Sequence, residues 1–287
     1  MEIRRRWVFS SSSRAAIANF GSSVVRTLFR ALFSLVFPDD CRVCGRPLHT
    51  IGRIPVCDGC LRQPEPLSAE FFCVDCRTPF VNPFPLDANG RCPICRSGLR
   101  GFDAAYCYGA YDGVLRQLIH IYKYGGVKTL ARPLGDLLAR ALPRHERVDG
   151  IVPVPLHWRR RWSRGFNQSA LLARELARRS GIPMVPALRR MRFTAAQAGL
   201  SNTSRRKNVA AAFGLRRTGG FAGKLAGRRF LLIDDVLTTG ATAAACANAL
   251  KRAGAARVAL LTIARVDRRM SGAHASASES TSGGRSR

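Results

Sequence analysis

Residues 231–242 read LLIDDVLTTGAT, and this stretch indicates the fold class of the chain. An apolar run predicts a buried strand that ends in an acidic turn at Asp234 and Asp235, and a loop of small and hydroxyl residues then leads into an Ala-rich helix over 243–252. Backbone N–H groups at a helix N-terminus bind phosphate, because the helix dipole is positive there. Carboxylates repel phosphate but suit sugar hydroxyls or a metal ion. We therefore expect a ligand with both a phosphate and a diol, such as a ribose 5-phosphate.

The same stretch closely resembles the phosphoribosyl-pyrophosphate (PRPP) signature of type I phosphoribosyltransferases. The resemblance implies an α/β fold in which a parallel sheet is flanked by helices. It also implies that Asp234 and Asp235 are the catalytic carboxylates, which hold the ribose hydroxyls and reach Mg²⁺. The residues implied to bind the 5-phosphate are Thr238, Thr239, Gly240, Ala241 and Thr242. The alternative is an ordinary strand–turn–helix in which the two acids only cap the helix.

Eight of the ten cysteines occur as four C-x-x-C pairs, all before residue 96. The pairs are Cys41/Cys44, Cys57/Cys60, Cys73/Cys76 and Cys92/Cys95. Two thiolates two residues apart bind one ion from a tight turn, and a second such turn completes a zinc tetrahedron. The simplest assignment takes the pairs in sequence, which gives a double zinc ribbon with two structural Zn²⁺ ions. An interleaved assignment stays open, and so does a disulfide framework, which the cytosolic character of the remaining chain disfavours. We interpret Cys107 and Cys246 as buried small hydrophobes.

The composition predicts four regions along the chain. They are a basic segment with an amphipathic helix over 1–37, the double zinc ribbon over 38–100, a phosphoribosyltransferase-like domain over 101–268 and a disordered tail over 269–287. The N-terminal helix is expected to lie on the protein's own core or on a membrane surface, and a signal peptide is the third alternative. No apolar run has the length of a transmembrane helix.

Between the zinc ribbon and the PRPP-like stretch, the pattern alternates between strands and helices. We expect strands over 103–111 and 150–155 and helices over 114–124, 128–142 and 169–179. Residues 189–213 are polar and basic with little periodicity, which is typical of a mobile loop. A last strand over 256–263 is expected to close the sheet.

The charge of the chain favours an anionic partner. Lys and Arg number 47 against 18 Asp and Glu, a formal net charge of +29, which suits nucleic acid, an anionic membrane surface or a polyphosphate. Within residues 157–168, four arginines lie among three aromatic residues. They are Arg159, Arg160, Arg161 and Arg164, with Trp158, Trp162 and Phe166. Base stacking and phosphate contacts from such a segment suit single-stranded DNA, although the tryptophans could equally pack into the core.

Three further segments resemble the ComF family. They read YDGVLRQLIHIYKYGG over 111–126, PVPLHWRRRWSRGFNQ over 153–168 and AAQAGLSNTSRRKNVAAAF over 195–213. The resemblance covers about residues 30–266 and implies a role in DNA uptake. A PRPP pyrophosphate needs a cationic cradle, and we expect Arg164, Asn167 and Lys123 to contribute to it. The alternatives are that the RGFNQ segment caps the next helix and that Lys123 only extends from a helix end.

Three functions remain open at this point. The first is a PRPP- and nucleic-acid-binding accessory protein of DNA uptake, with single-stranded DNA and the uptake machinery or a membrane surface as partners. The second is an active phosphoribosyltransferase for an unidentified acceptor, because no base-recognition element is evident. The third is a zinc-ribbon interaction module that senses PRPP. All three suit a cytoplasmic protein, either free or peripheral to the inner membrane.

Overall fold

The computed structural model describes residues 40–48, 52–98, 101–156, 165–191, 212–216 and 223–266. The predicted N-terminal helix, the arginine-rich segment up to Arg164, most of the loop over 189–213 and the C-terminal tail lie outside the described residues. The chain divides into two compact units, Met1–Cys60 and Leu61–Arg287. The first four cysteines belong to the first unit, and the last four share the second unit with the sheet.

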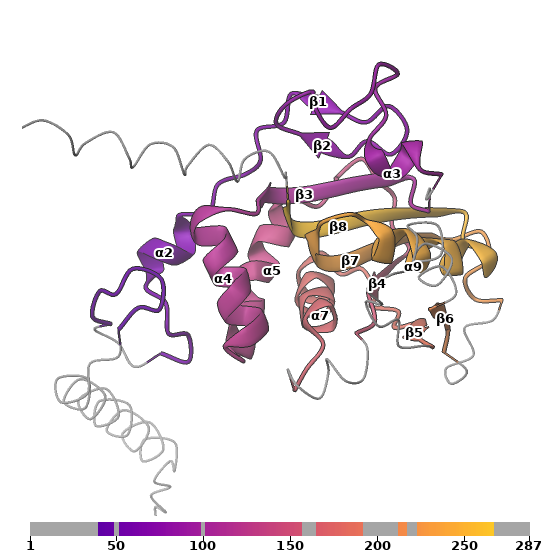
Figure 1. Ribbon diagram of the computed structural model, residues 1–287. Coiled ribbons are helices and arrows are strands. Elements are labelled where there is room, and N and C mark those ends of the chain that lie inside the picture. The colour runs from indigo at the N-terminus through magenta and orange to yellow at the C-terminus, as the bar shows by residue number, and fades with distance from the viewer. Residues whose placement is uncertain are drawn as a thin grey trace, which may run out of the picture. The chain divides into compact units, whose positions relative to one another are not determined.

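A four-stranded parallel sheet forms the centre of the second unit (Figure 1). Its strands run in the order β3 (Ala104–Ala110), β8 (Arg257–Arg265), β7 (Arg229–Leu237) and β4 (Gly150–Pro153). The inner strands β7 and β8 have apolar residues on both faces and are almost fully buried, as parallel strands covered by helices require. The prediction of a parallel sheet flanked by helices is therefore confirmed.

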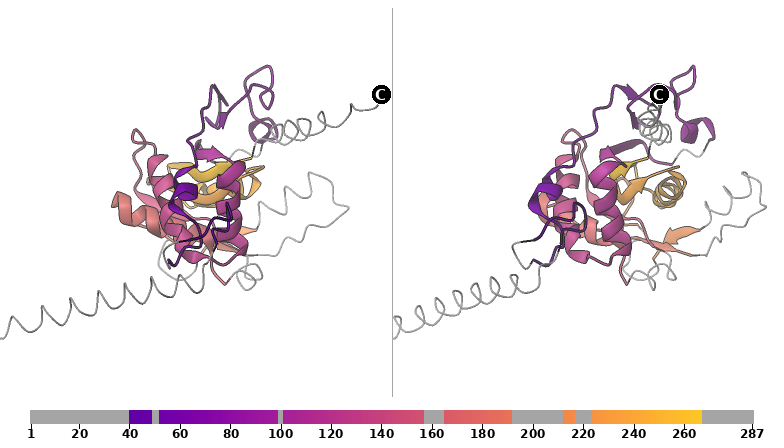
Figure 2. Two further views of the ribbon diagram at one scale, coloured as in Figure 1. Left: turned by 90° about the vertical axis from the view of Figure 1, so that its left-hand side faces the viewer. Right: turned by 60° about the vertical axis from the view of Figure 1, so that its left-hand side comes forward.

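Helices cover both faces of this sheet. Figure 2 shows α4 (Gly113–Tyr124), α5 (Ala131–Arg140) and α7 (Gln168–Ser180) on one face and α9 (Ala241–Arg252) on the other. A short 3-10 turn, η1 (Lys128–Leu130), joins α4 to α5. Each helix lies within a few residues of its predicted position. No helix in the described part of the chain is both long enough and apolar enough to cross a membrane.

One expectation about the sheet is wrong. Asp234 and Asp235 lie inside β7 instead of in a turn, because pairing with β8 continues past them to Leu237. The predicted last strand over 256–263 is present as β8, and it lies in the middle of the sheet, between β3 and β7. Both features depend on partners far away in the sequence, such as Asp234 and Thr262.

The ends of the predicted loop over 189–213 form a small antiparallel pair. Strand β5 (Leu188–Arg190) pairs with β6 (Phe213–Leu215), with Arg189 opposite Gly214. Leu188 and Phe213 are buried, and the pair contacts α9. These ends are thus ordered, whereas the residues between 192 and 211 lie outside the described part.

The elements that the structure describes in the cysteine-rich region are short. They are α2 (Asp58–Arg62), β1 (Phe71–Phe72), β2 (Pro79–Phe80) and α3 (Pro93–Arg96). The second ribbon, residues 71–98, packs on the parallel sheet through several contacts. The amide of Ala105 donates to the Cys76 carbonyl at 2.9 Å, and the Arg265 guanidinium lies 3.7 Å from the centre of the buried Phe80 ring. The second ribbon therefore shares one core with the sheet.

An ion pair joins β8 to the segment after α5. Arg257 donates two hydrogen bonds to the Glu146 carboxylate, at 2.6 and 2.9 Å, and the Tyr106 hydroxyl donates a third at 2.9 Å. The Arg257 contact is the main cause that lowers the pKa of Glu146. Because the folded-state pKa lies below the unfolded value, this carboxylate stabilises the fold above the unfolded pKa of about 4.3 and ceases to do so as the pH falls through the lower, folded-state pKa.

We accordingly expect Glu146→Gln to cost about 1 kcal/mol of unfolding free energy at pH 7, a modest value because Arg257 is 42% exposed and solvent screens the pair. The cost should shrink at pH 3 to 4. Urea titrations of the wild type and of Glu146→Gln at each pH give the difference in unfolding free energy between them. Acid effects that both proteins share cancel in this difference. A cost that is independent of pH would contradict the assigned role of the carboxylate.

Candidate functional site

The eight paired cysteines form two separate clusters. One contains Cys41, Cys44, Cys57 and Cys60, and the other contains Cys73, Cys76, Cys92 and Cys95. The four sulfur atoms of each cluster lie within 4.8 Å of one another. The arrangement is thus sequential, as the simplest assignment predicted, and not interleaved.

The sulfur spacing fits a tetrahedral zinc site. The Sγ atoms of Cys44 and Cys57 are 3.8 Å apart, and those of Cys76 and Cys92 are 3.6 Å apart. A Zn–S bond of 2.3 Å in a regular tetrahedron places its sulfurs about 3.8 Å apart, whereas a disulfide bond is about 2.05 Å long. All ten cysteines are free thiols, so the disulfide alternative finds no support. Backbone amides also point at the sulfurs, with the amide of Cys92 3.3 Å from Sγ of Cys73.

The two cysteines outside the clusters differ from each other. Cys246 is fully buried on α9, as expected of a small hydrophobe. Cys107 on β3 is only partly buried and lines a cavity, so the interpretation of a buried hydrophobe was wrong for this residue.

The acidic pair lies towards the carboxyl end of β7, where α/β sheets place ligands. One oxygen of Asp234 accepts hydrogen bonds from the Ser169 hydroxyl at 2.9 Å and from the Asp235 amide at 3.0 Å. Burial, followed by the charge of Asp235, raises the pKa of Asp234 to about 7. The nearby Lys123 charge acts against this rise but does not cancel it, so a ligand that brings hydroxyls or positive charge would favour the ionised form of Asp234.

Asp235 has a different partner. Lys123 Nζ lies 2.8 Å from its Oδ1, and both side chains are mostly buried, with 13% and 12% of their surface exposed. Lys123, in the last turn of α4, therefore forms an ion pair within the acidic site. This contact with Asp235 was not predicted from the sequence. The lysine thus lies in the last turn of α4, but its side chain is directed to Asp235 and is shielded from solvent.

The predicted phosphate loop follows the acidic pair directly. Gly240 caps the N-terminus of α9 in a left-handed conformation, with φ of +71°, and its carbonyl accepts from the Ala244 amide at 2.8 Å. A cavity of about 60 Å³ lies over this loop. Its lining includes Asp234, Thr238, Thr239, Gly240, Ala241 and Thr242. The structure thus brings one carboxylate and the five loop residues to one small cavity, and a helix N-terminus adjoins it.

A side chain from the second zinc ribbon packs under this loop. A Cβ atom at Gly240 would lie 3.3 Å from Cγ1 of Ile94 and closer still to its Cδ1. Ile94 stands between Cys92 and Cys95 of the second cluster and is 91% buried, since 9% of it is exposed. Gly240 is therefore required for its left-handed backbone and for this close contact.

Asn167 takes a structural position at the start of α7. Its side-chain oxygen accepts from the Ala170 amide at 3.4 Å, which caps the helix, and its nitrogen donates to the Val154 carbonyl at 3.2 Å. The side chain thus ties α7 to the end of β4. The predicted ligand contact of Asn167 stays a prediction, and Arg164 lies outside the described residues.

Sequence reasoning missed two residues of this site, Ser169 and Ile94. Ser169 is buried and binds Asp234 across 65 positions of sequence. A serine in the first turn of a predicted helix is usually a cap, so its sequence position carried no signal of this contact. Ile94 had the signal of an apolar residue between two paired cysteines, but its contact with Gly240 could not be predicted from the sequence.

Comparisons with known proteins agree with this architecture. A family model described as phosphoribosyl transferase domain matches residues 167–280. "DNA utilization protein YhgH" from Escherichia coli (strain K12) is 32% identical over 238 residues, which cover 80% of this chain and 99% of that protein. "Competence protein F" from Haemophilus influenzae is 30% identical over 232 residues, which cover 78% of this chain and 96% of that protein. The chain therefore matches these relatives over nearly their whole length.

Proposed function

The chain belongs to the ComF family of phosphoribosyltransferase-like proteins, and on this premise we propose that it is a PRPP-binding, nucleic-acid-associated accessory protein of DNA uptake. The observation that carries the proposal is the cavity that brings Asp234 to the loop 238–242 at the N-terminus of α9. A 5-phosphate suits the loop amides and threonine hydroxyls, and a ribose diol suits the acidic pair. One ligand with both groups occupies both halves of the site.

The electrostatics favour the same ligand. The Asp234–Asp235 pair provides oxygen donors of the kind that Mg²⁺ prefers, and the ion would neutralise the pyrophosphate of PRPP when both are bound. Lys123, 2.8 Å from Asp235, adds a cation that also suits the pyrophosphate. The ion pair with Asp235 holds the Lys123 ammonium in place before the ligand binds, so binding costs little side-chain conformational entropy.

Titration calorimetry tests the ligand directly. We expect PRPP to bind with Mg²⁺ present, and ribose 5-phosphate to bind more weakly because it lacks the pyrophosphate. Chelation of Mg²⁺ should weaken PRPP binding. If no heat accompanies PRPP addition in the presence of Mg²⁺, while an unrelated nucleotide does bind, the proposal is wrong.

The same protein preparation distinguishes an accessory protein from an enzyme. Stoichiometric pyrophosphate release from PRPP with a nucleobase, a protein or DNA as acceptor would favour an active phosphoribosyltransferase. Binding without release favours the accessory function, or a zinc-ribbon module that senses PRPP. A change in affinity for DNA when PRPP is bound would then favour the accessory function over a simple sensor.

The nucleic-acid part of the proposal rests on charge and on the relatives. The net charge of +29 and the sequence segment with Arg159, Arg160 and Arg161 suit single-stranded DNA, and the names of the relatives refer to DNA utilization and competence. A cytoplasmic protein, free or at the inner membrane surface, would meet internalised strands there.

We expect binding of single-stranded DNA to fall steeply with salt, by about 0.7 in log affinity per log salt for each phosphate contact. Replacement of Arg159, Arg160 and Arg161 together should reduce that slope by up to about two. Anisotropy of a labelled oligonucleotide between low and physiological salt measures both. An affinity that does not change with salt would remove nucleic acid from the proposal.

A further inference from the structure

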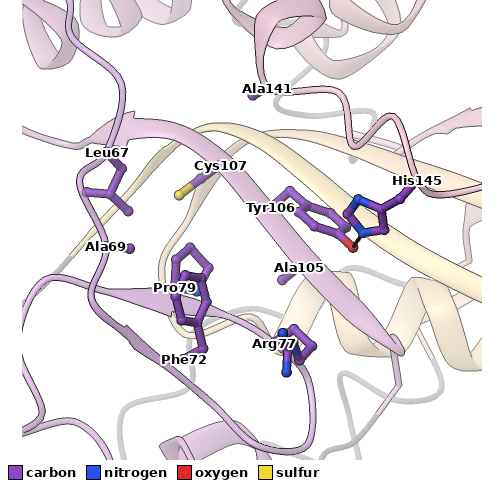
Figure 3. A pocket seen from close by; sticks show the side chains of 10 residues that line it. All are labelled: Leu67, Ala69, Phe72, Arg77, Pro79, Ala105, Tyr106, Cys107, Ala141 and His145. Carbon is purple, nitrogen blue, oxygen red and sulfur yellow. Dashed lines mark hydrogen bonds between the residues drawn. The ribbon is translucent and has the colours of Figure 1, made fainter.

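A second cavity lies beside the edge strand β3, between the second zinc ribbon and the end of α5 (Figure 3). Its volume is about 350 Å³, within the range of small-molecule sites. Its lining includes Phe72, Arg77, Pro79, Tyr106 and His145. It shares no lining residue with the cavity over the phosphate loop, so the proposed PRPP site does not account for it.

The walls of this cavity combine aromatic rings with hydrogen-bonding groups. Phe72 stands opposite Pro79 in the β1–β2 pair, and 47% of its surface is exposed, so its ring is available for stacking. Figure 3 shows the Tyr106 ring and the His145 imidazole across the cavity from Phe72. A flat ligand therefore meets an aromatic surface on each side.

Hydrogen bonding fixes the polar groups of the far wall. The Tyr106 hydroxyl donates to Glu146 at 2.9 Å, so the contact of 3.2 Å with His145 has Nε2 as its donor. Nδ1 of a neutral His145 then carries a lone pair that can accept from a ligand. Glu146 is itself paired with Arg257, so it does not cancel the positive charge at the cavity.

Arg77 supplies that positive charge from an unusual backbone position. It is the only non-glycine residue with positive φ in the described part of the chain, at +53°. The equivalent position after the first C-x-x-C turn is Gly45, with φ of +71°, and both amides donate to the carbonyl of the first cysteine of their turn. Glycine adopts this conformation without strain and arginine does not.

The backbone conformation at Arg77 favours glycine, so the arginine does not stabilise the fold at this position. Its side chain is therefore expected to have a function of its own. Within the described residues the Arg77 guanidinium has no carboxylate partner, whereas Arg91 of the same ribbon pairs with Asp75 at 3.4 Å. A strained backbone at the wall of a cavity is typical of a functional position. The unpaired guanidinium then suits a ligand phosphate, to which arginine binds with two parallel hydrogen bonds.

We propose that this cavity binds a nucleobase that carries a phosphate, with the base between Phe72 and Tyr106 and the phosphate on Arg77. The ligand is either a free mononucleotide or one nucleotide of a single strand, which share this chemistry. The site is independent of PRPP binding. If the source is a strand, the site deepens the nucleic-acid association proposed above, and it identifies where one base is held.

The test uses Arg77→Gly in the full chain, with Arg91→Ala as the control of equal charge in the same ribbon. Glycine relieves the backbone strain, so we expect two zinc ions per chain, an unchanged or higher melting temperature and unchanged PRPP binding. Thymidine monophosphate by calorimetry and a ten-residue oligothymidylate by anisotropy are the probes. We expect Arg77→Gly to weaken at least one of them about tenfold or more, and Arg91→Ala to have little effect.

The two probes separate the two sources. Loss of thymidine monophosphate binding in Arg77→Gly assigns the cavity to a free nucleotide, and loss of the oligothymidylate alone assigns it to a strand. Cross-linking of an oligonucleotide with 5-iododeoxyuridine should mark Phe72 or Tyr106. The proposal is overturned if neither probe binds, if Arg77→Gly and Arg91→Ala have equal effects, or if cross-links fall only outside the cavity. PRPP calorimetry on the same proteins reports the first site separately.

Discussion

Cys92→Ser is expected to remove the second zinc ion and to abolish PRPP binding, whereas Cys44→Ser removes the first zinc ion and leaves PRPP binding intact. The wild-type chain should contain two zinc ions, and each variant should contain one. The difference arises because Ile94, between the ligands Cys92 and Cys95, packs against Gly240 of the phosphate loop. Cys44 is in the other compact unit and offers the same ligand chemistry without that contact.

The expected effect on stability is also large for the second cluster. Cys73, Cys76 and Cys92 are part of the core that contains Ala243 to Leu250 of α9, so loss of the ion loosens the support of that helix. Structural zinc contributes folding free energy directly, and we expect Cys92→Ser to cost roughly 3 kcal/mol or more. For a chain of this size, that corresponds to a fall of roughly 10 °C in melting temperature.

Ile94→Ala separates the metal from the contact. It keeps all eight thiols and should retain two zinc ions, but it removes the side chain under Gly240. Truncation of a buried isoleucine lowers the unfolding free energy by a few kcal/mol, and part of that loss destabilises the phosphate loop. We therefore expect PRPP to bind about tenfold more weakly. Zinc content by atomic absorption and PRPP affinity by calorimetry decide the matter. Unchanged PRPP binding in Cys92→Ser would show that the loop does not depend on the ribbon.

The sequence was sufficient to predict the features that local patterns encode. The C-x-x-C spacing predicted the two sulfur clusters, and the run before Gly240 predicted a strand, a loop and a helix in their observed order. Features set by long-range pairing were not predictable. Asp234 continues a strand because it pairs with Thr262, and Ile94 meets Gly240 across the ribbon and the sheet. Arg77 stands where the matching turn has glycine, and only the backbone angles show that it adopts the same left-handed conformation.

Asp234→Asn is expected to abolish or greatly weaken PRPP binding without loss of stability. The amide oxygen of asparagine can still accept from Ser169 and from the Asp235 amide, so the local hydrogen bonds are kept. Loss of a charge-assisted contact costs about 1.5–3 kcal/mol, or about 10- to 150-fold in affinity. The pKa of Asp234 is raised to about 7 by burial and the charge of Asp235, above the unfolded value of about 3.9.

The sign of the stability effect follows from that raised pKa. The protonated carboxyl is favoured in the folded state, so ionisation of Asp234 lowers the unfolding free energy as the pH rises from about 4 to about 7. Asparagine resembles the protonated form at every pH. At pH 8, Asp234→Asn should therefore be as stable as the wild type or more stable, as is common where a site is organised for a ligand and not for the fold.

Asp235→Asn is expected to behave in the opposite way with respect to stability. It leaves the Lys123 ammonium, 13% exposed, without its carboxylate, and removal of one partner of a mostly buried pair costs about 3 kcal/mol. Lys123→Met in the same chain should recover most of that stability but not PRPP binding. Urea titrations and calorimetry on the four proteins measure both quantities. Equal destabilisation by Asp234→Asn and Asp235→Asn would mean that both carboxylates serve the fold, and the acidic pair would then no longer support a ribose-binding role.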